Sequence, residues 1–292
     1  MKTLYVIGNG FDLFHNLSTS YHDFEKYLFQ NDFFLWMLLD RYFEFQNRDG
    51  FWSDFEFDLG SFKSHLFFSD KNDVNPSEDE FKPSMIYCLE DNLIIESEYF
   101  VELIQRALSQ WIETINLEFV NKRVHLNEDS SFMTFNYTSL LESCYNISIN
   151  NIWHVHGFIE TDDLVIGHNT ILDKEDDFDE NGEYLRTPFT DAMSAASATQ
   201  GRFYKPVNDL INSNMKFFEE LTSIKSIIVL GHSLNPIDIP YFQKILQIAN
   251  EANWIVSFRD EFDKQHHLSV MKDLGIKEQN IQLIQLTDIL VE

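Results

Sequence analysis

Polar and glycine residues that could do chemistry stand at the ends of short apolar runs in this sequence. They form five groups, at residues 8–12, 134–138, 154–157, 167–169 and 231–234. A short apolar run that ends in such a group is typical of a buried strand followed by a turn. In a parallel α/β sheet the carboxyl ends of the strands meet at one edge, where ligands bind. We therefore expect these groups to converge on one edge of a sheet.

His154 and His156 are the candidates for acid–base chemistry. They are two residues apart in Ile152–His156, which we interpret as a strand, so their side chains should face the same side. A neutral imidazole there can act as a general base toward a sugar hydroxyl or a water molecule. A structural histidine and a metal pair are the alternatives, but no carboxylate pattern of metal-ligand spacing surrounds the two. We expect no metal.

Asn136 follows the apolar run Ser131–Phe135, and its amide can both donate and accept hydrogen bonds. Such a group could hold a ribose or orient an attacking water. Asn136 could equally cap the next helix, as could Thr138. Both interpretations stay open at this point.

The glycines Gly8 and Gly10 follow the first apolar run, Leu4–Ile7. Their backbone N–H groups could approach a pyrophosphate, but Leu13 stands where the dinucleotide fingerprint has its third glycine. A tight turn without a ligand is the alternative explanation.

Strand-like and helix-like segments alternate along most of the chain. The expected strands are 4–7, 131–135, 152–156, 164–166, 226–230, 254–258 and 281–286, and the expected later helices are 238–252 and 261–274. Such alternation is typical of a Rossmann-like α/β fold, a mostly parallel sheet with helices on both faces. Residues 1–20 and 125–292 would form this core, and the helical period of 21–124 predicts a large helical insert after the first strand.

Two segments interrupt this pattern. Glu160–Glu183 is strongly acidic and Thr187–Gln200 is rich in small residues, so we expect surface loops, one of which could cover the site. Asp238 follows Pro236 and would begin a helix, where it could serve as a cap. Lys205 could meet a phosphate or be a solvated side chain.

The composition limits the class of protein. The 21 basic and 48 acidic residues give a formal charge of −27, which repels phosphate backbones and anionic membranes, so neither is expected as a partner. Cys88 and Cys144 supply no disulfide framework, and no apolar run is long enough to cross a bilayer. We expect a cytoplasmic protein.

Several of these groups together resemble the bacterial AbiH family, which is named for abortive infection of phage-infected cells. The matching segments span nearly the whole chain in order: Leu4–Phe24, Phe132–Glu142, His154–Gly157, Ile166–Asn169 and Gly231–Phe242. The resemblance implies an antiphage role and a phage-derived trigger or a partner defence protein.

The order of the strand ends also resembles the sirtuin NAD-binding core, more distantly. This resemblance implies that His156 is the catalytic histidine and that Asn136 lies beside the nicotinamide ribose. It implies contact with NAD or a related dinucleotide by Gly8, Gly10, Gly231 and Ser233. We expect further contacts from other residues of the same polar groups and from nearby positions: Asn9, Phe11, Asp12, Thr134, His154, His232 and Asp238. The sequence departs from sirtuins at Thr138, where they have an aspartate, and it lacks their Cys-x-x-Cys zinc module, so protein deacylation is not expected.

These observations favour an abortive-infection effector that hydrolyses the nicotinamide N-glycosidic bond of NAD and releases nicotinamide and ADP-ribose. NAD would be a substrate, no metal would be needed, and the chain could form a homo-oligomer. A non-catalytic nucleotide-binding sensor that acts with a partner is the first alternative. A metal-dependent nuclease that uses His154, His156 and a carboxylate such as Asp12 or Asp238 is the second, and the acidic charge disfavours it.

Overall fold

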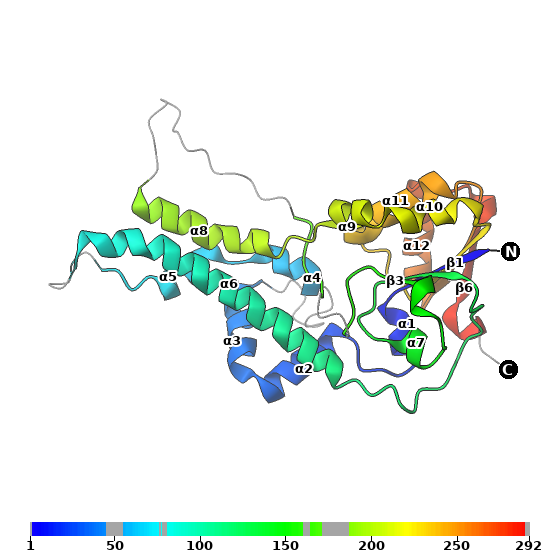
Figure 1. Cartoon of the computed structure of the whole chain (residues 1–292), viewed down its shortest axis with the longest axis horizontal. Helices are drawn as coiled ribbons and strands as arrows, with labels where there is room; N and C mark the ends of the chain where they lie inside the picture. The colour runs from blue at the N-terminus through cyan, green and yellow to red at the C-terminus, as the bar shows by residue number, and fades with distance from the viewer. Residues whose placement is uncertain are drawn as a thin grey trace, which may run out of the picture. The chain divides into compact units, whose positions relative to one another are not determined.

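The computed structural model describes residues 2–44, 55–75, 77, 81–159, 164–170 and 187–289 (Figure 1). The chain divides into two compact units. The first comprises Met1–Ser20, Ser109–Val165 and Pro206–Glu292, and the second comprises Tyr21–Leu108 and Ile166–Lys205.

The first unit contains a six-stranded parallel sheet. Its strands are β1 (Thr3–Ile7), β2 (Ser131–Thr134), β3 (Ile152–His154), β4 (Ser226–Leu230), β5 (Asn253–Phe258) and β6 (Ile281–Gln285). They lie in the order β3-β2-β1-β4-β5-β6, and each pair of neighbours is parallel. This is the strand order of dinucleotide-binding Rossmann folds. The predicted α/β class with a parallel sheet is confirmed.

Alternation along β1 explains why both faces of the sheet are covered. Leu4 and Val6 belong to one apolar core, whereas Tyr5 and Ile7 belong to the other. The helices of this unit are α1 (Asn9–Phe14), α7 (Leu140–Ser143), α9 (Val207–Ser213), α10 (Met215–Glu220), α11 (Ile239–Ile248) and α12 (Glu261–Asp273). The helices α1 and α7 pack on one face of the sheet. The helices α9 to α12 contribute to the core on the other face.

The second unit is helical, as the period of the sequence predicts. It holds α2 (Tyr21–Asn31), α3 (Phe33–Tyr42), α4 (Phe55–Asp58), α5 (Ser64–Lys71) and α8 (Pro188–Arg202), together with most of α6 (Pro83–Glu113). Its aromatic side chains pack on one another: the Phe100 ring centroid lies 6.1 Å from that of Phe43 and 6.1 Å from that of Phe67. These rings therefore form a core rather than a ligand groove.

Residues 188–202 form a helix, so the prediction of a loop at Thr187–Gln200 is wrong. Thr187 and Thr190 form a capping box, and Pro188 stands in the first turn, where its missing N–H costs nothing. The buried face of α8 consists of small residues such as Ala192 and Ala196. Because these side chains carry little hydrophobicity, the helical period is faint in the sequence.

The predicted strand at Leu164–Ile166 is also wrong, because residues 164–167 are described and form no strand. The nearest pairing is an isolated bridge between His168 and Tyr204. The remainder of the acidic segment Glu160–Glu183 lies outside the described residues, apart from 164–170.

The division into units differs from the expected one in two segments. Residues 166–205 cluster with 21–108 rather than with the sheet, and residues 109–124 cluster with the sheet rather than with the insert. In the segment 166–205 the helix α8 packs on α5, and the Phe203 ring lies 5.6 Å from that of Phe43. Lys205 is buried and its ammonium lies 2.8 Å from Glu56, so the expectation of a solvated lysine is wrong. The helices of the described ranges include none whose length and hydropathy would let it span a bilayer.

Candidate functional site

The strand register lines up the polar groups at one edge of the sheet. Ile7 at the end of β1 pairs with Thr134 of β2 and with Leu230 of β4, and Thr134 pairs with His154 of β3. Four strands therefore end in one row. The strand order reverses between β1 and β4, which is where ligands bind in open α/β sheets.

The glycine turn after β1 packs tightly against the turn after β4. Gly8 N–H donates to Leu230 O at 3.0 Å, and Gly10 N–H donates to Gly231 O at 2.7 Å. A Cβ atom on Gly8 would lie 2.6 Å from His232 Cα. The close approach of the two turns accounts for the glycines at both positions, because a side chain would not fit there. No ligand is needed to explain them, since their N–H groups already have backbone acceptors.

Gly231 completes this contact, and we expect Gly231→Ala to lower the free energy of unfolding by about 3 kcal/mol. The residue has a φ of +63°, and an added Cβ would lie 2.1 Å from Phe11 N. Gly275 is the matched control, since it has a φ of +86° with no atom within 4 Å of an added Cβ. Gly275→Ala should cost only about 1 kcal/mol. Urea unfolding of both variants measures the difference, and equal losses would contradict the packing argument.

Asp12 is the most deeply buried carboxyl group at this edge, with 1% of its surface exposed. Asn136 Nδ2 donates to its Oδ1 at 2.7 Å, and Thr138 Oγ1 donates to its Oδ2 at 2.6 Å. Burial raises the pKa of Asp12 to about 7, against the opposing effects of these two donors and of His154. A buried carboxyl that titrates near neutral pH can exchange a proton under cellular conditions.

Asn136 and Thr138 thus donate their side-chain hydrogen bonds to Asp12 and do not cap a helix. The helix α7 has Ser139 at its N-cap. Because Asp12 accepts from the amide nitrogen of Asn136, the orientation of that amide is fixed. Its Oδ1 is buried and has no hydrogen-bond partner among the described residues. An acceptor held in this way is available to a ligand hydroxyl or a water molecule.

His154 pairs with Glu142, a residue that the sequence analysis did not single out. The His154 Nε2 atom lies 2.6 Å from Glu142 Oε1, and its ring stacks on Phe158 with 4.2 Å between centroids. His154 Nδ1 and Glu142 Oε2 are buried and have no partner in the part of the chain that the structure describes. His154 therefore carries an orphan polar atom, and this histidine is among the groups that oppose the raised pKa of Asp12.

His156 belongs to a different group, with His232 and Asp238. Its Nε2 lies 3.8 Å from Asp238 Oδ1, and His232 Nε2 lies 3.5 Å from Asp238 Oδ2. The Phe135 ring packs edge-on against both imidazoles, at 5.2 Å from His156 and 4.5 Å from His232. The aspartate thus lies between two histidines that come from different strand ends, as an orienting carboxylate does.

The turn after β4 holds His232 in one tautomer. His232 Nδ1 accepts a hydrogen bond from Leu234 N–H at 2.9 Å, so in a neutral ring the proton is on Nε2, which faces Asp238. Leu234 has a φ of 54°, which is unusual for a bulky residue. Such strain beside a polar cluster is typical of functional sites.

A family comparison identifies the chain. The model of the family described as Bacteriophage abortive infection AbiH matches residues 4–258. The chain belongs to the AbiH family. Comparisons with curated proteins and with solved structures found no match. The resemblance to AbiH proteins is thereby confirmed, and the likeness to sirtuins stays a prediction.

In this AbiH-family chain, two expectations about geometry are wrong. His154 and His156 were expected to face one side, but β3 ends at His154 and a turn begins at Val155, so the two imidazoles have different partners. Asp238 stands at the N-cap of α11 without capping it through its side chain. Its carboxylate instead faces the two histidines.

The fourth polar group, Gly167-His168-Asn169, lies in the second unit and not with the sheet. His168 has structural partners there: its Nε2 bonds to Gln200 O at 2.9 Å, and Thr170 N–H donates to its Nδ1 at 3.0 Å. Among the described residues, no three His, Cys, Asp or Glu side chains are grouped so that they could hold a metal ion.

Proposed function

We propose that this chain is an abortive-infection effector that cleaves the N-glycosidic bond between nicotinamide and ribose in NAD. Membership of the AbiH family supports the antiphage part of the proposal. The observation that carries the enzymatic part is the buried polar constellation at the point where the strand order reverses. It consists of two buried groups at the strand ends: Asn136, whose amide Asp12 holds in place, and His156, which has a carboxylate beside it.

His156 is the proposed general base. Bond cleavage releases neutral nicotinamide and leaves an oxocarbenium-like ribose, which a water molecule attacks at the same carbon. The imidazole takes the proton from this water, and ADP-ribose and nicotinamide are the products. Asp238 beside Nε2 would orient the ring and stabilise its protonated form.

Asn136 is the proposed positioning group for the ribose hydroxyl or the attacking water. Its Oδ1 can accept from either, and Asp12 prevents the amide from turning away, because it accepts from Nδ2. A preorganised acceptor supports catalysis because it needs no rearrangement during the reaction.

The N–H groups of Gly8 and Gly10 are not the proposed pyrophosphate contacts, since both already donate to carbonyls at the end of β4. Ser233 is exposed beside His232 and is the proposed contact for the ADP half. Asn136, His156 and Asp238 are all buried. Access for NAD therefore requires an opening movement, which fits an effector that stays inactive until infection provides a trigger.

The experiment uses full-length chain purified from unchallenged and from phage-challenged cells, incubated with NAD. We expect release of nicotinamide and ADP-ribose by the challenged preparation, and a rate at least about tenfold lower for Asn136→Ala. Chromatography of the products measures both. Binding of NAD without any product from either preparation would favour the sensor, and activity that a chelator removes would favour the nuclease.

A further inference from the structure

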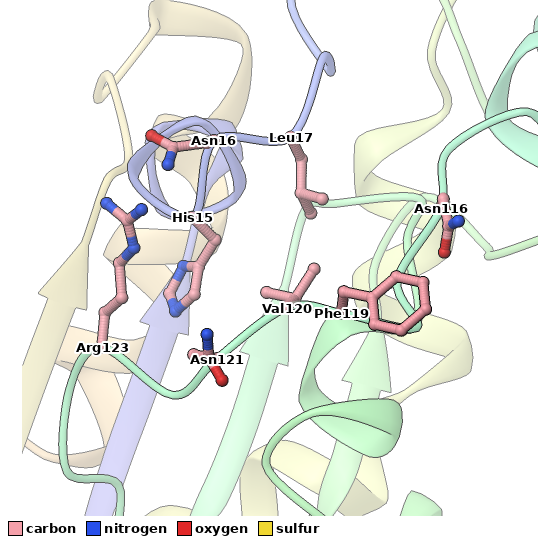
Figure 2. A pocket seen from close by; sticks show the side chains of 8 residues that line it. All are labelled: His15, Asn16, Leu17, Asn116, Phe119, Val120, Asn121 and Arg123. Carbon is pink, nitrogen blue, oxygen red and sulfur yellow. The ribbon is translucent and has the colours of Figure 1, made fainter.

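A cavity in the first unit is lined by none of the residues proposed for NAD cleavage (Figure 2). Its volume is about 420 Å³, within the range of small-molecule sites. The lining residues come from the end of α1 and from the segment between α6 and β2, and they include His15, Asn116, Phe119, Val120 and Arg123.

Arg123 is the feature of this cavity that points to an anion. The other arginines in the described ranges, Arg41, Arg106, Arg202 and Arg259, each have a carboxylate within 4 Å. Among the described residues Arg123 has none, although the chain has a net charge of −27 and carboxylates are abundant. Its guanidinium lies 5.5 Å from the Phe14 ring centroid, a contact that carries no opposing charge. A guanidinium in this state is suited to a phosphate.

His15 does not compete for such an anion. Its Nδ1 donates to Phe11 O at 2.7 Å, so its Nε2 accepts from the Tyr145 hydroxyl at 2.6 Å. Burial and, to a lesser degree, the charge of Arg123 lower the pKa of His15. The imidazole therefore lines the cavity as an uncharged ring with both nitrogens hydrogen-bonded, and recognition of an anion would depend on Arg123.

Phe119 gives the opposite end of the cavity an aromatic character. Figure 2 shows Arg123 and His15 at one end and Phe119 and Asn116 at the other, with Val120 between them. The Phe119 side chain is 80% exposed, which is unusual for a large apolar ring. Asn116 Oδ1 accepts from Glu118 N–H, so its amide nitrogen is the group that it can offer to a ligand.

We propose that this cavity binds a nucleoside monophosphate, with the phosphate on Arg123 and the base stacked on Phe119. Three features favour this ligand: a guanidinium with no carboxylate within 4 Å among the described residues, the exposed ring at the far end, and the volume between them. These features involve none of the residues proposed for NAD cleavage, so the two proposals can fail separately.

The test titrates the full chain with adenosine 5′-monophosphate (AMP), adenosine and inorganic phosphate in a calorimeter. We expect AMP to bind more tightly than either fragment. Arg123→Gln should weaken AMP by about tenfold or more, which is the loss expected for a charge-assisted contact. Phe119→Ala should weaken AMP severalfold and leave phosphate binding unchanged. Because Phe119 is exposed, this variant should fold normally.

Two control variants locate the binding. Arg259→Gln removes an exposed arginine of the same unit that already has carboxylate partners, and it should bind AMP as the native chain does. His156→Ala should also bind AMP unchanged. Loss of AMP binding in His156→Ala with retention in Arg123→Gln would overturn the proposal and place the nucleotide at the strand ends. Absence of saturable AMP binding at millimolar concentration would overturn it as well.

Discussion

Replacement of His156 by alanine is expected to lower the rate of NAD cleavage by a factor of about 10² to 10⁴, the usual contribution of a positioned general base. The imidazole lies 3.8 Å from Asp238 and packs on Phe135, so its orientation is restricted before substrate arrives. Alanine removes the proton acceptor and leaves the carboxylate in place. The rate of nicotinamide release under saturating NAD measures the loss.

His125→Ala is the matched control, because His125 is an exposed histidine of the same unit. It should cleave NAD at the native rate. Asp238→Asn should show an intermediate loss, since the base remains but its orienting charge is gone. A His156→Ala protein that folds normally and retains the native rate would contradict the assignment of the base.

The second large effect concerns the pH dependence of stability, and it comes from Asp12. Burial raises the pKa of this group from 3.8 to about 7 in the folded chain. Below about pH 4 both the folded and the unfolded chain carry the proton. Between pH 4 and 7 the unfolded chain loses it first, so the contribution of Asp12 to stability falls as the pH rises and levels off above 7. The pKa difference of about three units between the folded and the unfolded chain corresponds to roughly 4 kcal/mol of unfolding free energy.

Asp12→Asn should remove this dependence. The amide can still contact Asn136 and Thr138, and it carries no ionisable proton. We expect the unfolding free energy of Asp12→Asn minus that of the native chain to rise by up to roughly 4 kcal/mol from pH 4 to pH 7. Denaturant unfolding across this range measures the difference. Asp273→Asn, which changes an exposed aspartate, should give a constant difference, and a constant difference for Asp12→Asn would contradict a raised pKa.

The fold was predictable where the local pattern and the tertiary structure agree. The runs that became β1 and β4 are apolar and β-branched and end at glycine, so their strands could be placed from the sequence. The helix α8 could not, because Ala192 and Ala196 bury little apolar surface and give only a weak period. Its membership of the second unit comes from packing on α5, which is distant in sequence.

The candidate site was predictable in its position but not in its pairing. The strand-end rule brought Asp12, Asn136 and His156 to one edge of the sheet, because parallel strands end together. It could not show that Asp12 holds Asn136, since that contact joins residues 124 positions apart. Glu142 was missed for the same reason: one acidic residue in a short helix carries no local signal for its contact with His154.

The most direct test of NAD cleavage as the basis of defence is the NAD pool of phage-challenged cells that carry either the native chain or His156→Ala. Both chains should be present at equal levels, which immunoblotting checks. NAD should collapse after challenge in cells with the native chain and stay constant with His156→Ala, and protection should be lost with the variant. Protection by the native chain with an unchanged NAD pool would contradict NAD cleavage as the basis of defence.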